Sequence, residues 1–164
     1  MASDPIRVLF VCLGNICRSP LAEAVFRHQV RERGLEDRFE IDSAGTSGYH
    51  RGSPPDRRSA ETARRRGIEI TGRSRSVAAD DLRRFDYVIA MDAENEAELR
   101  ALMARGGGAA RVHRLREWDP RPDDGDVPDP YYGGPRGFDE VHDIVERAAA
   151  AFLEHVVREH GLGG

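Results

Sequence analysis

Apolar and polar positions follow two different periods along the chain, and these periods separate short strands from longer helices. The segment 6–11 is an almost continuous apolar run rich in β-branched residues, which predicts a strand buried on both faces. Segments 39–45, 86–91 and 112–115 predict three more strands. Apolar residues recur at helical spacing over 19–34, 56–67, 93–105 and 138–155, and 79–85 predicts a short helical turn.

This order of elements predicts the fold class. Strands that alternate with helices form a parallel sheet joined by helical crossovers. We therefore expect an α/β fold, a single-domain three-layer sandwich with helices on both faces of a four-stranded parallel sheet. The segment 118–135 is rich in Pro, Asp and Gly and has no periodicity. Loops of that length in a compact domain are usually disordered or functional.

Size and composition narrow the class of protein. A chain of 164 residues is expected to form one domain over 1–164, with frayed tails at 1–5 and 159–164. Its net charge of −4 argues against general nucleic-acid binding. No apolar run is long enough for a membrane span, and the first residues lack the basic region of a signal peptide. We expect a cytoplasmic monomer that binds neither nucleic acid nor membrane.

The chain has two cysteines, Cys12 and Cys17, and both follow the first strand. A secreted disulfide scaffold would need more of them, spread along the chain. The spacing lacks the second pair of ligands that a zinc site requires. We therefore expect no metal, and a reducing compartment that would keep both thiols free.

The segment from Cys12 to Ser19 has the chemistry of an anion-binding loop. A strand, a short loop and a helix N-terminus present free backbone N–H groups to a negative charge. Gly14 and Asn15 tolerate positive φ, which lets successive amides curl around a ligand. Arg18 adds a planar fork that suits two phosphate oxygens. A Cys12 thiol in this field should ionise readily and act as a nucleophile, with the Ser19 hydroxyl beside it.

A simpler interpretation of the same residues stays open at this point. Cys12 would be a buried structural cysteine at the end of a strand, and Arg18 would make a surface ion pair. Ser19 would then serve only as a helix N-cap, with Pro20 at the first helical position. The strand before the loop and the Gly-Asn pair within it favour the anion site.

Cleavage of a phosphate monoester also needs an acid that protonates the leaving oxygen. The long loop supplies Asp129, which precedes a proline and two tyrosines. From chemistry alone, four other carboxylates in this loop compete with it, namely Asp119, Asp123, Asp124 and Asp126.

The loop sequence closely resembles the active-site loop of low-molecular-weight protein tyrosine phosphatases. In that family the general acid is the aspartate of a C-terminal Asp-Pro-Tyr-Tyr segment, which residues 129–132 match. The resemblance extends over about 6–156 and implies a sheet with strand order 2-1-3-4. Further matches lie at 43–46, 54–56, 85–87 and 91–92.

The resemblance implies hydrolysis of phosphotyrosine monoesters in proteins or peptides through a phosphocysteine intermediate, without a cofactor. Cys12 would attack phosphorus, Arg18 would hold its oxygens, and Asp129 would protonate the phenol and later activate water. Ser19 would stabilise the departing thiolate. The phosphate would contact the loop residues Leu13, Gly14, Asn15, Ile16, Cys17 and Arg18.

The same resemblance assigns supporting roles. Asn15, Ser19 and Ser43 match positions whose hydrogen bonds hold the loop in shape. At Gly72 the chain departs from relatives that carry a histidine contacting Asn15, so a thinner network is expected. Asp92 has two interpretations, as an ion-pair partner of Arg18 or as a helix N-cap.

Aromatic side chains are expected at the mouth of the site. Leu13, Tyr49 and Tyr131 match positions that line it, and Tyr132 lies next to them. Such walls would hold a phenyl ring and favour phosphotyrosine over the shorter phosphoserine. The histidines have no ligand or triad spacing, so we interpret His50 and others as surface or packing residues.

Cys17 has two interpretations. It could capture an oxidised Cys12 as a disulfide and so prevent irreversible oxidation. Alternatively, it is only a small buried side chain under the loop.

Three other functions compete with phosphotyrosine hydrolysis. Phosphoarginine phosphatases of the same family tend to have Thr where this chain has Ile16, and they lack the paired tyrosines. Arsenate reductase needs a further redox cysteine outside the loop, which is absent here. A silent phosphate-binding or redox-sensing module would not need both Cys12 and Asp129.

Overall fold

A four-stranded parallel sheet forms the centre of the molecule. The structure is a computed structural model that describes residues 4–130 and 135–162, and within them the strands lie in the order β2-β1-β3-β4. Every pairing between neighbours is parallel, which confirms the predicted fold class and strand order. The strands are β1 (Ile6–Cys12), β2 (Phe39–Gly45), β3 (Tyr87–Ala90) and β4 (Arg111–Arg114).

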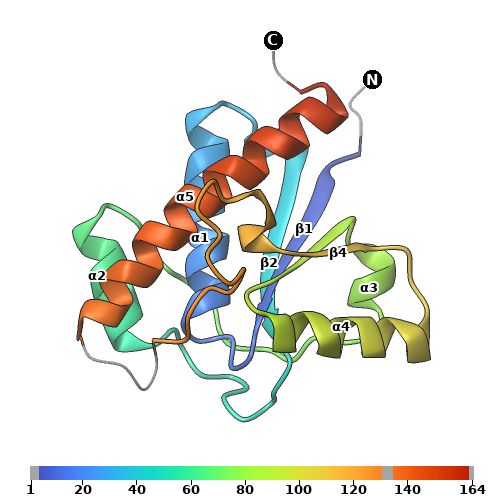
Figure 1. Cartoon of the computed structure of the whole chain (residues 1–164), viewed down its shortest axis with the longest axis horizontal. Coiled ribbons are helices and arrows are strands. Elements are labelled where there is room, and N and C mark those ends of the chain that lie inside the picture. The colour runs from blue at the N-terminus through green and yellow to red at the C-terminus, as the bar shows by residue number, and fades with distance from the viewer. Residues whose placement is uncertain (1–3, 131–134, 163–164) are drawn as a thin grey trace.

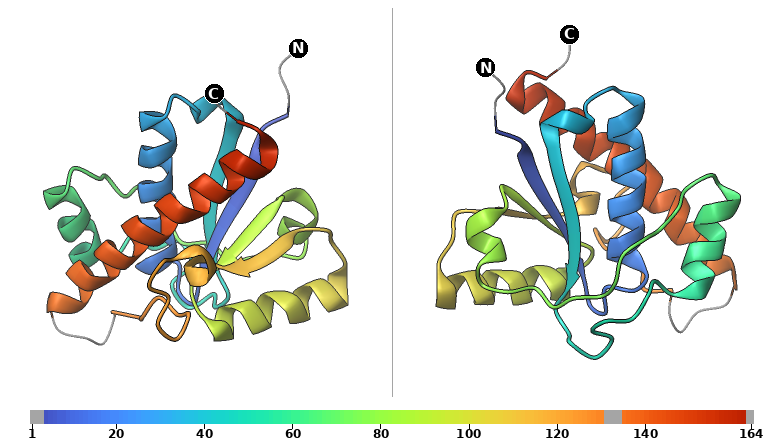
Figure 2. Two further views of the ribbon diagram at one scale, coloured as in Figure 1. Left: turned by 45° about the horizontal axis from the view of Figure 1, so that its top comes forward. Right: turned by 180° about the vertical axis from the view of Figure 1, so that it is seen from behind.

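Helices cover both faces of this sheet (Figures 1 and 2). Those that pack on one face are α1 (Arg18–Glu32) and α5 (Pro135–His160), with α2 (Arg57–Arg65) against α5. The other face is covered by α3 (Asp81–Arg84) and α4 (Ala93–Gly106). Two short 3₁₀ turns lie beside the sheet, η1 (Glu36–Arg38) and η2 (Leu115–Trp118).

Strand β1 connects the two cores because its side chains alternate between them. Val8, Phe10 and Cys12 belong to the core under α1 and α5, whereas Leu9 and Val11 belong to the core under α3 and α4. All five are buried, as the apolar run predicted. Cys12 is therefore a core residue at the last position of a central strand.

A cluster of aromatic rings holds α5 on the sheet. The Phe152 ring lies edge-on to Phe10 and Tyr87, with centroids 6.3 and 5.7 Å away, and packs at a tilt on Phe26 and Trp118 at 5.3 and 4.8 Å. Large side chains packed this way bury much apolar area and fix the position of the helix.

The C-terminal helix is longer than the sequence predicts. Helix α5 continues to His160, whose Nε2 lies 2.9 Å from the Tyr87 hydroxyl, and Leu162 beyond it is buried. These contacts hold the chain against the sheet as far as Leu162. No helix in the described part of the chain is long and apolar enough to span a membrane.

The topology creates a crevice at the carboxyl end of β1. The chain leaves β1 towards β2 on one side and later returns to β3 on the other, so the connections diverge at this edge. Ligands bind at such switch points in open α/β sheets. The segments that follow β1, β2 and β3 all meet there.

Candidate active site

The segment from Cys12 to Arg18 forms a tight loop between β1 and α1. Asn15 adopts a positive φ of 56°, a conformation that asparagine tolerates better than most residues. Its backbone N–H donates to Cys12 Sγ at 3.3 Å, so an amide of the loop points at the sulfur. Gly14 does not share the positive φ. A Cβ at Gly14 would lie 3.1 Å from the His50 ring, so a larger residue there would crowd that ring.

The carbonyl groups of this loop are bound from outside. The C=O and N–H of a peptide group point in opposite directions, so holding the carbonyls from outside turns the N–H groups of the loop towards its interior. A Cβ on Gly45 would lie 2.8 Å from the Leu13 oxygen, so β2 also approaches at a distance that only glycine permits. The donors are Thr46 N to Cys12 O, Ser47 N to Leu13 O, Ser74 Oγ to Gly14 O and Asp56 N to Ile16 O, at 2.7–2.9 Å.

Ser19 contacts the cysteine sulfur directly. Its Oγ lies 3.0 Å from Cys12 Sγ, and Asn15 Nδ2 donates to the same Oγ at 2.9 Å. The N-cap position of α1 belongs to Cys17 and has no side-chain cap bond, so the interpretation of Ser19 as an N-cap is wrong. With Asn15 occupying one lone pair, the Ser19 hydroxyl can donate its hydrogen to a thiolate.

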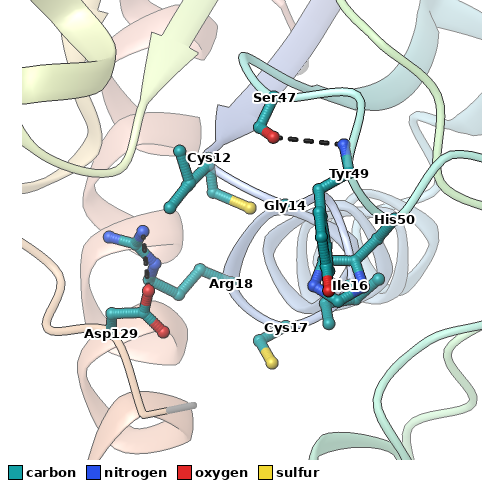
Figure 3. Close-up of a pocket in the computed structure, with 10 residues that line it drawn as sticks. Cys12, Gly14, Ile16, Cys17, Arg18, Ser47, Tyr49, His50 and Asp129 are labelled. Carbon is teal, nitrogen blue, oxygen red and sulfur yellow. Dashed lines mark hydrogen bonds and ion pairs between the residues drawn. The ribbon is translucent and has the colours of Figure 1, made fainter. Parts of the chain in front are cut away.

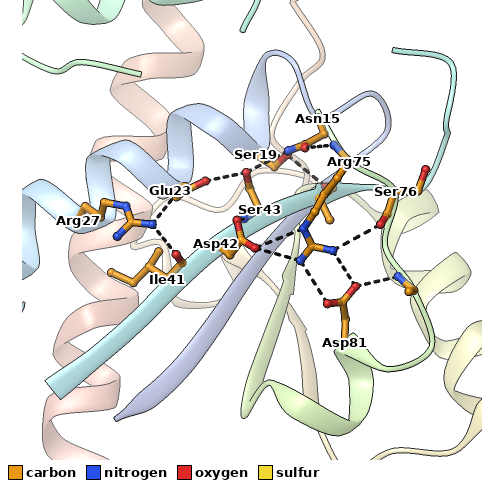
Figure 4. A network of polar contacts seen from close by, with 12 residues as sticks. Asn15, Ser19, Glu23, Arg27, Ile41, Asp42, Ser43, Arg75, Ser76 and Asp81 are labelled. Atoms are coloured by element: carbon orange, nitrogen blue, oxygen red, sulfur yellow. Dashed lines mark hydrogen bonds and ion pairs between the residues drawn. The ribbon is translucent and has the colours of Figure 1, made fainter. Parts of the chain in front are cut away.

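Asn15 is held on both ends of its amide (Figure 4). Nδ2 also donates to Ser43 Oγ at 3.0 Å, and Oδ1 accepts from the Arg75 backbone N–H at 2.9 Å. Ser43 in turn donates to Glu23 at 2.7 Å. The sequence predicted Asn15, Ser19 and Ser43 as one group, and the structure brings them together.

Two members of this network were not predicted. Glu23 lies one turn beyond Ser19 on α1, and the contribution of Arg75 is a backbone amide, which any residue could supply. Gly72 borders a cavity of about 90 Å³ that Asn15 and Glu23 also line. The network expected to be thin near Gly72 nevertheless satisfies the Asn15 amide, because Arg75 donates to it.

Arg18 lies buried beside the loop with its guanidinium held by the protein. Nη1 donates to Asp92 Oδ2 at 2.7 Å and to the Val127 carbonyl at 3.0 Å, and Nη2 lies 3.5 Å from Asp129 Oδ2. Burial lowers the pKa of Arg18, but the charges of Cys12, Asp92 and Asp129 outweigh it and raise the pKa above its ordinary value. Arg18 is a fixed cation at the site.

Asp92 combines its two predicted roles. Oδ2 pairs with Arg18, and Oδ1 accepts from the Asn95 N–H at 2.8 Å as the N-cap of α4. One carboxylate thus links the first residue of α1 to the start of α4.

A pocket of about 490 Å³ opens above the loop. Figure 3 shows Asp129 facing Arg18 on one side, with Tyr49 and His50 on the other. Leu13 and Tyr49 line the mouth, as expected, and are 49% and 87% exposed, which leaves both available to a ligand. The pocket is lined by Cys12, Leu13, Gly14, Ile16, Cys17, Arg18, Ser47, Tyr49, His50 and Asp129.

Two lining residues were missed by the sequence. His50, expected to be a surface or packing residue, lines the pocket and stacks edge-on against Tyr49 at 4.9 Å between centroids. Ser47 fixes the same turn, since its Oγ accepts from the Tyr49 N–H at 3.1 Å. Neither His50 nor Ser47 is part of a sequence motif that indicates a functional site. The predicted lining residues Tyr131 and Tyr132 fall outside the described residues.

Both thiols are free and buried. Burial raises the pKa of Cys17 well above its ordinary value, and the Asp56 carboxylate adds to this effect. Cys17 is therefore a neutral thiol beneath the loop at physiological pH. Among the described residues, no group of three or more His, Cys, Asp or Glu could hold a metal ion.

Fold and pocket together define a class of protein. It is the class of α/β proteins that place a cysteine thiol and an arginine in one tight loop, beneath a pocket at the carboxyl edge of a parallel sheet.

Comparison with known proteins identifies the family. Residues 7–161 match the family model described as low molecular weight phosphotyrosine protein phosphatase. The low molecular weight protein-tyrosine-phosphatase YfkJ of Bacillus subtilis is 46% identical over 158 residues, which are 96% of this chain and 99% of that protein. The chain belongs to the low molecular weight phosphotyrosine protein phosphatase family, whose members are hydrolases.

Solved structures agree with this assignment. The crystal structure of YfkJ superposes with a TM-score of 0.89 at 43% identity, covering 97% of this chain and 99% of that one. The crystal structure of DARP, a Drosophila arginine phosphatase, gives a TM-score of 0.87 at 33% identity, covering 92% and 98% of the two chains.

Asn15 provides a test of the loop geometry. We expect Asn15→Ala to lower the free energy of unfolding by about 2–4 kcal/mol, because the buried partners lose their bonds and alanine resists a positive φ. Asn15→Gly loses the same bonds but accepts the φ value, so it should be no less stable than Asn15→Ala. Urea denaturation of the three proteins measures both effects. An Asn15→Ala protein within about 0.5 kcal/mol of wild type would contradict this account.

Proposed function

We propose that this protein hydrolyses phosphotyrosine monoesters in proteins through a phosphocysteine intermediate. The observation that carries the proposal is that Cys12 and Asp129, from opposite ends of the chain, line one pocket with Arg18 contacting Asp129. Membership of the phosphatase family supports the same chemistry.

In the first step, the Cys12 thiolate attacks phosphorus in line with the phenolic oxygen. The S–P bond forms, the P–O bond to the phenol breaks, and Asp129 gives its proton to the leaving oxygen. Arg18 and the loop amides hold the three other phosphoryl oxygens while charge develops on them. Phenol has a pKa of about 10, so the phenolate is a poor leaving group and protonation of the leaving oxygen accelerates the step.

In the second step, a water molecule hydrolyses the phosphocysteine. Asp129, now a carboxylate, takes a proton from the water as its oxygen attacks phosphorus, and the P–S bond breaks. The electron pair returns to Cys12 Sγ, where the Ser19 hydroxyl at 3.0 Å and the Asn15 amide at 3.3 Å donate to the anion. Inorganic phosphate then leaves and the site is restored.

The shape of the pocket favours an aryl phosphate. Cys12 is 2% exposed, so the phosphorus must enter a recess, while Leu13 and Tyr49 stand exposed at the rim. The phenyl ring of phosphotyrosine is long enough to bring the phosphate to Cys12 while it packs on the rim. The side chain of phosphoserine is shorter, so the peptide backbone would meet the rim before the phosphate reached Cys12.

Phosphoarginine is the second candidate substrate, since the arginine phosphatase DARP shares this fold at 33% identity. Ile16, which occupies the position where threonine is typical of that branch, is buried and packs with Cys17 and Phe138. This apolar contact, together with the Tyr131-Tyr132 pair in the sequence, favours phosphotyrosine.

We also propose that residues 1–164 act as one monomeric domain in the cytoplasm. The family model matches residues 7–161 as one continuous segment, which supports a single domain over them. The mechanism above has no step that requires a cofactor.

The nucleophile is tested by replacing one atom. We expect wild-type protein to hydrolyse a phosphotyrosine peptide at least about tenfold faster than the matched phosphoarginine peptide. Cys12→Ser should abolish both reactions, because a serine hydroxyl is a far weaker nucleophile here, yet still bind inorganic phosphate by calorimetry. Released phosphate is measured for each peptide. Turnover by Cys12→Ser would refute the scheme, and faster release from phosphoarginine would reassign the substrate.

The acid is tested by the choice of leaving group. Asp129→Ala should lower kcat/KM for phenyl phosphate by about 10²–10⁴-fold. For 2,4-dinitrophenyl phosphate, whose phenolate leaves without protonation, kcat/KM should change little. Asp124→Ala, a neighbouring carboxylate outside the pocket, is the matched control and should leave both values near wild type. Equal losses of kcat/KM on both substrates would rule out Asp129 as the acid.

A redox role for Cys17 is a further part of the proposal. Hydrogen peroxide oxidises Cys12 to a sulfenic acid and is itself reduced to water. Cys17 Sγ then attacks the sulfenic sulfur, hydroxide leaves as water with the thiol proton, and the Cys12–Cys17 disulfide forms. Because burial raises the pKa of Cys17, the thiolate fraction is small at neutral pH, and capture should accelerate as the pH rises.

Recovery after oxidation tests this role. After peroxide and then a thiol reductant, wild-type protein should regain most of its rate, whereas Cys17→Ser should regain little because the sulfenic acid is oxidised further. Each protein is compared with its own untreated rate. Inorganic phosphate present during oxidation should protect both. Equal recovery of the two proteins would leave Cys17 with a packing role only.

A further inference from the structure

The segment 119–130, which we call the Asp129 loop, has neither strand nor helix, yet it is firmly held. The Asp119 side chain at its start is fully buried, and Val127 near its end is 0% exposed. A long irregular segment with buried polar groups needs specific partners for them. What holds this loop therefore decides where Asp129 lies.

Arg116, on the 3₁₀ turn η2, is the main partner. Its side chain is only 3% exposed and its guanidinium lies inside the curve of the loop. Nε donates to Asp119 Oδ2 at 2.9 Å, and Nη1 donates to the Asp126 carbonyl at 2.9 Å. Nη2 donates to the Arg121 carbonyl and to Asp123 Oδ2. One rigid fork thus binds the loop at four points along its length.

Asp119 anchors this arrangement to α5. Its two oxygens accept from Arg147 Nε at 2.8 Å and Nη2 at 3.1 Å, and the Arg121 N–H donates at 2.9 Å. Burial raises the pKa of Asp119, but Arg147, the Arg121 amide and Arg116 outweigh it and hold the pKa below its ordinary value. Asp119 is therefore a carboxylate that bridges two arginines.

The far end of the loop joins the active site directly after the Arg116 contact. Asp126, whose carbonyl binds Arg116, is followed by Val127, whose N–H donates to the Met91 carbonyl at 2.8 Å. The Val127 carbonyl accepts from Arg18, and Asp129 lies two residues further on. The chain is thus pinned on both sides of the Asp126–Val127 peptide just before the acid.

We propose that Arg116 is the positioning residue for Asp129 in the proposed phosphatase reaction. It lies outside the pocket and touches neither phosphate nor leaving group. It sets the path of residues 119–126 so that Asp129 reaches the leaving oxygen. This inference rests on the proposed function, in which Asp129 is the acid.

The expected effect is selective because proton transfer needs the carboxyl within about 2.6–3.2 Å of the leaving oxygen. A displacement of about 1 Å costs on the order of 10²-fold in rate. The hydrogen bonds that shape the phosphate-binding loop come from residues other than Arg116, among them Asn15, Ser19 and Ser43. Arg18 loses part of its support if the Asp129 loop shifts, but its bond to Asp92 lies outside that loop and keeps the guanidinium in place. Loss of Arg116 should therefore damage acid catalysis and spare phosphate binding.

The test compares Arg116→Met with Arg66→Met. Arg66 makes a similar pair of ionic contacts, to Asp139 and Asp143 on α5, but lies away from the Asp129 loop. We expect Arg116→Met to lower kcat/KM for phenyl phosphate about 10–100-fold and to change kcat/KM for 2,4-dinitrophenyl phosphate by less than about threefold. The inhibition constant of inorganic phosphate should stay within about twofold of wild type. Arg66→Met should show no difference between the two substrates.

Two further variants keep the inference testable if Arg116→Met does not fold. Arg116→Lys keeps the charge but reaches fewer acceptors, and should show a smaller loss of the same selective kind. Arg147, whose side chain is 25% exposed, is the outer partner of Asp119. Arg147→Met should also lower kcat/KM more for phenyl phosphate than for 2,4-dinitrophenyl phosphate.

Equal losses of kcat/KM on both substrates, or weaker inhibition by phosphate, would show that Arg116 is only structural and would overturn the inference. Rates near wild type in all three variants would overturn it as well. A leaving-group effect that is absent even in Asp129→Ala would instead refute the assignment of the acid, so the two failures are distinguishable.

Discussion

The structure depends on one constraint, a buried sulfur atom held by its neighbours at the end of the central strand β1. Cys12 packs in the core on one side. On the other side the Asn15 N–H donates to its sulfur, and the Ser19 hydroxyl lies within hydrogen-bond distance of it. Asn15 can do this only with a positive φ, which its three side-chain contacts stabilise. Strain at the loop is thus balanced by hydrogen bonds to β2 and to the segment before α3. The proposed nucleophile is therefore preorganised by parts of the chain that lie outside the pocket.

Arg18 extends this order to the rest of the site. Its guanidinium joins Asp92 after β3, Val127 and Asp129 in the Asp129 loop, and its own helix α1. In the proposed reaction, a phosphate dianion would meet a cation whose orientation is already set, so little reorganisation would be needed when charge develops on phosphorus. The same contacts bring Asp129 into the pocket that Cys12 lines, although the two residues come from opposite ends of the chain.

The sequence predicts the fold because the spacing of apolar residues distinguishes strands from helices. It also predicts the centre of the site, because Cys12, Arg18 and Ser19 stand in one short motif. Asp129 could not be separated from Asp119 by chemistry alone, since both are carboxylates in the same loop. Asp119 proves to be buried between arginines, whereas Asp129 faces the pocket. The Arg75 amide and the Val127 carbonyl had no signal, because backbone groups are the same at every residue.

The two oxygens of Asp92 have a consequence for how this fold can vary. One caps α4 on one face of the sheet, and the other orients the arginine of α1 on the opposite face. A chimera that exchanged α4 for the equivalent helix of another α/β protein would shift this carboxylate and with it the Arg18 guanidinium. The β3–α4 junction is therefore a poor crossover point for recombination, although it is only two residues long.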